Sequence, residues 1–307
     1  MGFIPGGEQW TIKADGYEAV VVEVGGGVRA LRLDGVEIID EYAANELPPG
    51  SSGQVLAPWP NRIRDGRYTF GGVSHQLGLS EPVRHTAIHG LVNWVRWSEL
   101  EAGPDRVVLG YDLPAQPGYP WPLRLRSEWS VSADGLRAAH EVTNLGDEPA
   151  PFGFSVHPYL KVPGLSGVDE ALLRVPGRSR LLTDARLLPI GAARVAGTEF
   201  DFTEPRQLGK LVLDTAFGDV ARGPDGGSAV ELSSAAGARV RVWADEKFGW
   251  WQVFTSDTLS GERYRRAAAI EPMTCPPDAF RSGRDVIVLE PGGSWQGAWG
   301  IDARLPG

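Results

Sequence analysis

Short runs of alternating apolar and polar residues, each closed by turn residues, make up most of the chain. Alternation with a period of two is typical of strands that bury one face. Gly71-Gly72 and Asp134-Gly135 stand between neighbouring runs and predict hairpin turns. The clearest runs are 17–24, 28–33, 67–70, 106–113, 123–131, 136–143, 229–232, 239–244, 250–255 and 286–289.

Helical periodicity is nearly absent from the sequence. No stretch of about 12 residues keeps an apolar stripe at i, i+3, i+4 and i+7 without an interrupting Gly or Pro, so the pattern predicts an all-β fold. For 307 residues this means two sandwiches or one large curved sandwich. No linker or change of composition separates two halves, and we expect a single domain over residues 1–307. The sequence shows no repeat with a fixed period of 20–50 residues, which argues against a propeller.

Composition and charge narrow the possible partners. The formal charge of −9 argues against nucleic acid. No apolar run of about 18 residues predicts a membrane span, and the N-terminus lacks signal-peptide features, so we expect a cytoplasmic protein without a membrane partner. One cysteine, Cys275, excludes an internal disulfide and a multi-cysteine metal site. The 11 Trp residues favour a buried core over sugar stacking.

Two segments in the first third of the chain carry candidate binding residues. Arg62 follows Pro-Trp-Pro-Asn and precedes a hairpin, which places a fork of hydrogen-bond donors at a strand end. His85 and His89 have the i, i+4 spacing of zinc ligands on a helix, but their surroundings are not helical and no metal site is predicted. From spacing alone, a structural role for these histidines is favoured.

Two later segments carry candidate catalytic residues. His157 precedes Pro158, which favours extended backbone, and a histidine at a strand end can act as a general acid or base near neutral pH. Glu271 closes the apolar run 267–270, where a carboxylate is costly unless it has a partner. No nucleophile motif surrounds Cys275.

Taken in order, these segments resemble the aldose 1-epimerase (galactose mutarotase) family over most of the chain. The segments that contain Arg62 and His89 are most similar to the bacterial branch of this family that includes sulfoquinovose mutarotase. The motifs that carry the resemblance are Pro58-Trp59-Pro60-Asn61-Arg62-Ile63, Ile88-His89-Gly90, His157-Pro158-Tyr159, Leu213-Asp214-Thr215-Ala216-Phe217 and Ile270-Glu271-Pro272.

The resemblance implies a large antiparallel β-supersandwich with few short helices. It implies an enzyme that interconverts the α and β anomers of a free sugar, with Glu271 as catalytic base and His157 as catalytic acid. The sugar-binding residues that it implies are Arg62, His89 and Asp214. This chemistry needs no metal and no cofactor. The expected partner is a small-molecule sugar, and the expected assembly is a monomer or homodimer.

Other functions compete with this interpretation. A hexose-6-phosphate 1-epimerase would need a basic cluster, for which the candidates near the motifs are Arg64, Arg67, Arg281 and Arg284. A glycosidase would need two carboxylates, such as Glu271 and Asp214. A non-catalytic carbohydrate-binding protein would need neither Glu271 nor His157, so the presence of both favours an enzyme. The net negative charge favours a neutral or sulfonated sugar over a phosphorylated one.

Overall fold

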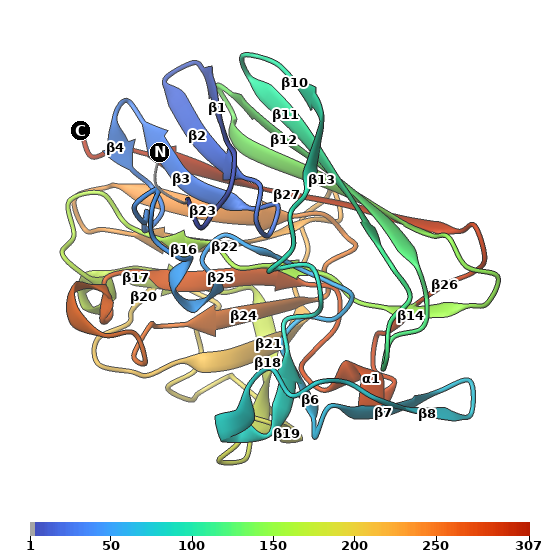
Figure 1. The fold of residues 1–307 in the computed structure, drawn as a ribbon. Helices are drawn as coiled ribbons and strands as arrows, with labels where there is room; N and C mark the ends of the chain where they lie inside the picture. The colour runs from blue at the N-terminus through green and yellow to red at the C-terminus, as the bar shows by residue number, and fades with distance from the viewer. Residues whose placement is uncertain (1–3) are drawn as a thin grey trace.

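Antiparallel strands joined by short loops form nearly all of the regular structure in the computed structural model, which describes residues 4–307 (Figure 1). The one α-helix among these residues, α1 (Ala279–Ser282), is a single turn, and no helix in 4–307 is long and apolar enough to cross a membrane. Short 3₁₀ segments occur at Pro49–Ser51, Pro82–Arg84, Val168–Glu170 and Gly261–Arg263. The predicted all-β fold with few short helices is confirmed.

A nine-stranded sheet curves along one side of the molecule. Burial alternates residue by residue along its central strands, so one face packs on the core and the other meets solvent. In spatial order its strands are β10 (Ser98–Ala102), β11 (Arg106–Leu113), β12 (Leu123–Ser132), β13 (Gly135–Asn144), β27 (Ser294–Arg304), β23 (Arg239–Ala244), β22 (Ser228–Ser233), β17 (Leu172–Arg174) and β20 (Arg206–Gln207).

An eight-stranded sheet faces it across the core. Its central strands, which cross the middle of Figure 1, are buried along nearly their whole length, so both faces of the sheet are covered there. Its strands in order are β19 (Pro189–Arg194), β18 (Gly177–Thr183), β21 (Asp214–Val220), β24 (Trp250–Phe254), β25 (Ala268–Met273), β15 (Ser155–Val156) and β5 (Val55–Leu56), with β16 (Tyr159–Leu160) paired to β25.

Smaller sheets complete the fold. A four-stranded sheet of β1 (Gln9–Ala14), β2 (Tyr17–Val22), β3 (Val28–Leu33) and β4 (Val36–Glu37) packs against β12. The two-stranded pairs are β6 (Arg62–Arg64) with β9 (Thr86–Ile88), β7 (Arg67–Phe70) with β8 (Val73–Gln76), and β14 (Ala150–Phe152) with β26 (Ile287–Leu289). The β7–β8 hairpin extends to one side beside α1 (Figure 1).

One large apolar cluster between the sheets forms the core. It includes Trp129 and Trp299 from the nine-stranded sheet and Trp251 from the eight-stranded sheet. Eight of the 11 Trp residues of the sequence are buried, in agreement with the core role expected for them.

The predicted runs correspond closely to strands. Nine of them match β2, β3, β7, β11, β12, β13, β22, β23 and β24 with ends that differ by a few residues, and 286–289 contains β26. The Gly71-Gly72 and Asp134-Gly135 turns join β7 to β8 and β12 to β13, so both hairpins are confirmed. The single-domain organisation stays a prediction.

Replacing Trp129 tests how much this core contributes to the stability of the fold. Its ring is fully buried and its Nε1–H donates to the carbonyl oxygen of Gly26 at 3.1 Å. We expect Trp129→Ala to lower the free energy of unfolding by about 3–5 kcal/mol, measured by urea denaturation. Trp94→Ala is the matched control, because Trp94 is 54% exposed and its loss is expected to cost at most about 0.5 kcal/mol. Equal effects of the two substitutions would contradict this assignment.

Candidate active site

Three adjacent strands of the eight-stranded sheet place polar side chains on the face opposite the main core. Along β24, Trp251 and Val253 point into the core, so Gln252 must point to the other face. Gln252 is paired directly with Glu271 on β25. Residues directly opposite on antiparallel strands share a face, so Glu271 lies beside Gln252.

Apolar clusters flank this polar group on the same face. They exclude water from the surroundings of Glu271, which is itself only 2% exposed. One cluster consists of Leu181, Ala216, Trp250 and Met273. The other consists of Tyr159, Ala267 and Ala269, with Phe254 and Leu259 packed against them.

The two-stranded ribbon of β6 and β9 brings Arg62 and His89 to the same place. Arg62 begins β6 opposite Ile88, and His89 follows directly after β9. The backbone turns sharply there, with φ of 64° at His89 and 76° at Gly90. A Cβ at Gly90 would lie 2.0 Å from the carbonyl oxygen of Ala57, so glycine is required at this position and its turn orients His89.

His157 joins the site from the end of β15. Its backbone N–H donates to the carbonyl oxygen of Gln54, and its own carbonyl oxygen accepts from the N–H of Gly53. Its ring stacks on Tyr159 with centroids 5.0 Å apart and meets His89 edge-on at 5.3 Å. The backbone contacts and the two rings together fix the direction of the imidazole.

A cavity of about 260 Å³ lies where these elements meet. All five residues predicted from the sequence line it: Arg62, His89, His157, Asp214 and Glu271. The other lining residues are Gly50, Ser51, Asn61, Glu81, Arg84, Ile88, Tyr159, Phe254, Thr258 and Leu259. Its volume falls just below the range of roughly 300–1,000 Å³ typical of drug-sized ligands, so it suits a small one.

Two close contacts between titratable side chains lie at the cavity. His157 Nε2 lies 3.4 Å from Glu271 Oε1, and Arg62 Nη1 lies 3.7 Å from Asp214 Oδ2. The side-chain amide of Gln252 donates to Asp214 as well. The two carboxylates are therefore held by different partners, although they lie in one site.

Burial moves the pKa values of Glu271 and His157 in opposite directions. Desolvation raises the pKa of Glu271 well above 4.5, and the negative charge of Asp214 adds to this. The pKa of His157 is lowered from 6.5 to about 4, mainly by desolvation and also by the positive charge of Arg62. Compared with water, the Glu271 carboxyl holds a proton more firmly and the His157 imidazole holds one less firmly. The pair is suited to exchange a proton with a bound ligand.

Several buried polar atoms at this site have no hydrogen-bond partner among the described residues. They are Nδ1 of His89, Nδ1 of His157, Oε2 of Glu271 and Oε1 of Gln252. An unpartnered buried polar atom is costly. His89, His157 and Glu271 line the cavity, so their unpartnered atoms are available there to water or to a polar ligand.

Sequence reasoning missed part of the site. Gln252 lies in an apolar strand, and Glu81 and Arg84 lie at the two ends of the short 3₁₀ segment Pro82–Arg84, which has no recognised motif. Only the strand register of β24 with β25 could have indicated Gln252. For Glu81 and Arg84 the sequence holds no signal beyond their closeness to His89.

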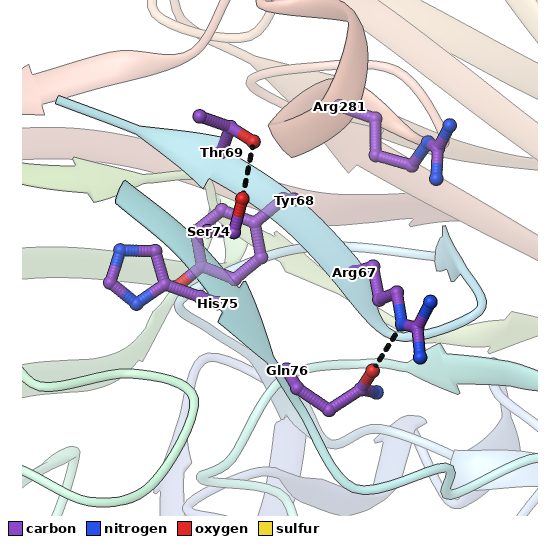
Figure 2. Close-up of a pocket in the computed structure, with 7 residues that line it drawn as sticks. All are labelled: Arg67, Tyr68, Thr69, Ser74, His75, Gln76 and Arg281. Atoms are coloured by element: carbon purple, nitrogen blue, oxygen red, sulfur yellow. Dashed lines mark hydrogen bonds between the residues drawn. The ribbon is translucent and has the colours of Figure 1, made fainter. Parts of the chain in front are cut away.

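The arginines proposed as an anion cluster are wrong for this cavity, because none of the four lines it. Arg67 and Arg281 face a separate hollow of about 550 Å³ on the β7–β8 hairpin and α1, shown in Figure 2. Arg64 pairs with Asp184 and Asp278, and Arg284 lies over the ring of Trp250. Closeness to the motifs in sequence did not mean closeness in space.

Other candidate chemistry receives little support from the structure. Cys275 is buried, and desolvation raises the pKa of its thiol to about 12, which disfavours a nucleophilic thiolate. Within residues 4–307, no three His, Cys, Asp or Glu side chains are grouped in a way that could hold a metal ion.

Comparison with known proteins identifies relatives over the whole fold. The family model described as aldose 1-epimerase matches residues 8–301. The uncharacterized protein YihR of Escherichia coli K12 is 32% identical over 287 residues, which cover 93% of this chain and 90% of YihR. Two solved structures share the fold. A GalM/aldose epimerase homologue from C. elegans has a TM-score of 0.86 and 17% identity, and the match covers 98% of this chain and 99% of that one. Galactose 1-epimerase from Lactobacillus acidophilus has a TM-score of 0.80 and 20% identity, and the match covers 96% of this chain and 94% of that one.

Neutralising Glu271 should stabilise the folded protein. Because the folded-state pKa is raised, folding favours the protonated carboxyl; that contribution is present below pH 4.5 and is lost as pH rises through the raised pKa. We expect Glu271→Gln to raise Tm at pH 7 by a few degrees, since about 1 kcal/mol corresponds to roughly 2–4 °C in a protein of this size class. Calorimetry at pH 5 and pH 8 should show the larger gain at pH 8. A lower Tm at both values would contradict the burial argument.

Proposed function

Because the chain belongs to the aldose 1-epimerase family, we propose that it is a mutarotase that interconverts the α and β anomers of a free aldohexose or related sugar. One observation carries the proposal. Glu271 and His157 meet at 3.4 Å in a small cavity, and each carries a buried polar atom that has no partner in the part of the chain that the structure describes. A proton donor and a proton acceptor are therefore held together where a small polar ligand fits.

The reaction requires two proton transfers. Glu271 removes the proton of the anomeric hydroxyl while His157 delivers a proton to the ring oxygen, and the bond between C1 and the ring oxygen breaks. Rotation about the C1–C2 bond turns the other face of the aldehyde toward the oxygen. The reverse transfers then close the ring as the second anomer and return both groups to their starting states.

The shifted pKa values support this exchange of roles. The raised pKa of Glu271 makes its carboxylate a stronger base than in water, and the lowered pKa of His157 makes its protonated ring a stronger acid. Each can therefore act as acid in one direction of the reaction and as base in the other. No net proton is consumed.

Arg62, His89 and Asp214 are proposed to bind the hydroxyl groups and the ring oxygen of the sugar. Arg62 offers only donors, Asp214 as a carboxylate offers only acceptors, and neutral His89 can offer either. Burial, with the nearby charges of His157 and Arg62, lowers the pKa of His89 well below 6.5, so it is neutral at physiological pH. Such a mixed set suits hydroxyls, which donate and accept.

We propose a neutral or sulfonated aldohexose as substrate. Arg62 and Arg84 are the guanidinium groups of the cavity, and both are already paired with Glu81. Asp214 adds a further negative charge. A dianionic phosphate would have to compete with these carboxylates, so a phosphorylated sugar is disfavoured.

Polarimetry on fresh single anomers tests the activity. The panel is glucose, galactose, xylose, a sulfonated hexose and a hexose 6-phosphate, and we expect faster mutarotation of at least one neutral or sulfonated sugar. Glu271→Gln should lower this rate by about 10²–10⁴, because glutamine keeps the shape but cannot accept a proton. Near-normal activity of that variant would remove Glu271 from the mechanism. A tenfold preference for the phosphorylated sugar would overturn the substrate proposal.

Variants of the other residues separate catalysis from binding. We expect His157→Ala to lower kcat about 10²-fold or more, because it removes a group that acts in the transition state. Arg62→Ala and Asp214→Ala should also raise KM, since these side chains hold the bound sugar as well. Initial rates over a range of sugar concentrations give both constants. A His157→Ala variant altered only in KM would reverse the assignment of acid and ligand.

A further inference from the structure

We propose that Glu81 is a positioning residue of this site: it selects which edge of the Arg62 guanidinium faces the cavity and offsets the charge of that guanidinium. The inference rests on the proposed function and adds to it a residue outside the acid–base pair. Glu81 lies in the loop between β8 and β9, directly before Pro82. Its role follows from its hydrogen bonds, its backbone anchoring and the charges around it.

Both oxygens of the Glu81 carboxylate are fully occupied by donors. Oε2 accepts from Arg62 Nε at 2.8 Å and from Thr86 Oγ1 at 2.7 Å. Oε1 accepts from Arg62 Nη2 at 3.2 Å and from Arg84 Nη1 at 2.9 Å. Desolvation alone would raise the pKa of Glu81, but the bonds from Arg62 and Thr86 outweigh it and lower the pKa. Glu81 is therefore a fixed anion, with little capacity left to bind a sugar or carry a proton.

This arrangement determines the orientation of Arg62. Two of the three guanidinium nitrogens, Nε and Nη2, are taken by Glu81. The third, Nη1, is left pointing toward Asp214 Oδ2 at 3.7 Å, on the cavity side. A planar fork held at two points cannot rotate, so the free edge of Arg62 is aimed before any ligand arrives.

The backbone holds Glu81 firmly enough for this task. Its N–H donates to the carbonyl oxygen of Thr86 at 3.0 Å, and the Thr86 N–H donates back to the carbonyl oxygen of Glu81 at 3.2 Å. Thr86 belongs to β9, which pairs with β6, the strand that carries Arg62. The donor and the acceptor of the pair are thus fixed to one two-stranded ribbon.

The charge of Glu81 also reaches the acid–base pair through Arg62. The positive charge of Arg62 lowers the pKa values of Glu271, His157 and His89. Glu81 opposes that field from the other side of the guanidinium. The further charged or titratable groups that face the cavity are Arg84, Asp214 and Tyr159. Without Glu81, two guanidinium groups would lose their shared counterion, and the pKa values of Glu271 and both histidines would fall.

Glu81→Gln is the principal test, because it removes the charge and keeps the size. We expect kcat/KM to fall at least about tenfold, mainly through KM, since small misplacements of binding groups have effects of this order. The acid limb of the pH profile of kcat/KM should move to lower pH, because the pKa of Glu271 falls. Glu81→Asp keeps the charge with a shorter reach, so it should raise KM but leave the acid limb close to its native position.

Asp112→Asn provides the matched control. Asp112 makes the same two-point contact with an arginine, Arg124, at 2.9 and 2.8 Å, but the pair is exposed and outside the cavity. It should leave kcat, KM and the pH profile unchanged. If Glu81→Gln fails to fold, Thr86→Val removes one donor to Glu81 without changing the charge. The KM of this variant should rise by roughly two- to tenfold, because that is the effect expected from the loss of one hydrogen bond. An unchanged KM would overturn the proposal.

An NMR titration of the imidazole rings supplies a measurement that does not depend on activity. In Glu81→Gln, His89 and His157 should take up a proton at lower pH than in the parent protein. Native kinetics and native histidine titration in that variant would overturn the positioning role. A second result would also overturn it: Glu81→Gln loses activity, its acid limb does not move, and Glu81→Asp behaves in the same way. That outcome would be a purely structural effect. Absence of mutarotation by the unmodified protein on every sugar contradicts the proposed function alone, because the histidine titration still tests Glu81.

Discussion

The burial of a carboxylate in the middle of a fully covered strand is the constraint on which the rest of the site depends. Glu271 lies in β25, where every residue is buried, and a charge there is unfavourable unless other groups compensate for it. His157 contributes one partner at 3.4 Å, and Arg62 contributes a favourable charge at longer range. One oxygen of Glu271 still has no hydrogen-bond partner within residues 4–307. This oxygen is therefore available to water or to a polar ligand in the cavity.

The charges around Glu271 are arranged in alternation. Glu81 holds Arg62, and Arg62 approaches Asp214, whose negative charge raises the pKa of Glu271. Gln252 stands beside both carboxylates and donates to Asp214 without adding a charge. This order keeps a cation between the two anions that bind it. The cavity can thus present donors and acceptors to a sugar with no large excess of either charge.

Local sequence predicted the strands well because each strand that buries one face repeats with a period of two, as β12 and β23 do. Glu271 could also be singled out, because a carboxylate that ends an apolar run is chemically unusual. Gln252 could not, since a neutral side chain in β24 gives no signal until the pairing with β25 is known. Arg67 and Arg281 were assigned to the wrong place for a related reason: nearness to the motifs in sequence does not show where the hairpin strand β7 and the helical turn α1 direct their side chains.

The direct pairing of Gln252 with Glu271 makes the site depend on the count of residues in each strand. Because side chains alternate between faces, one residue inserted into β24 would exchange the positions of Trp251 and Gln252. An indole would then enter the cavity and an amide would enter the core. We therefore expect a change of length to be tolerated more readily in the connecting segments that contain Gly50 and Leu259, which also line the cavity, than in these strands. Differences in substrate choice are expected to arise in those segments, while the distance between Glu271 and His157 stays the same.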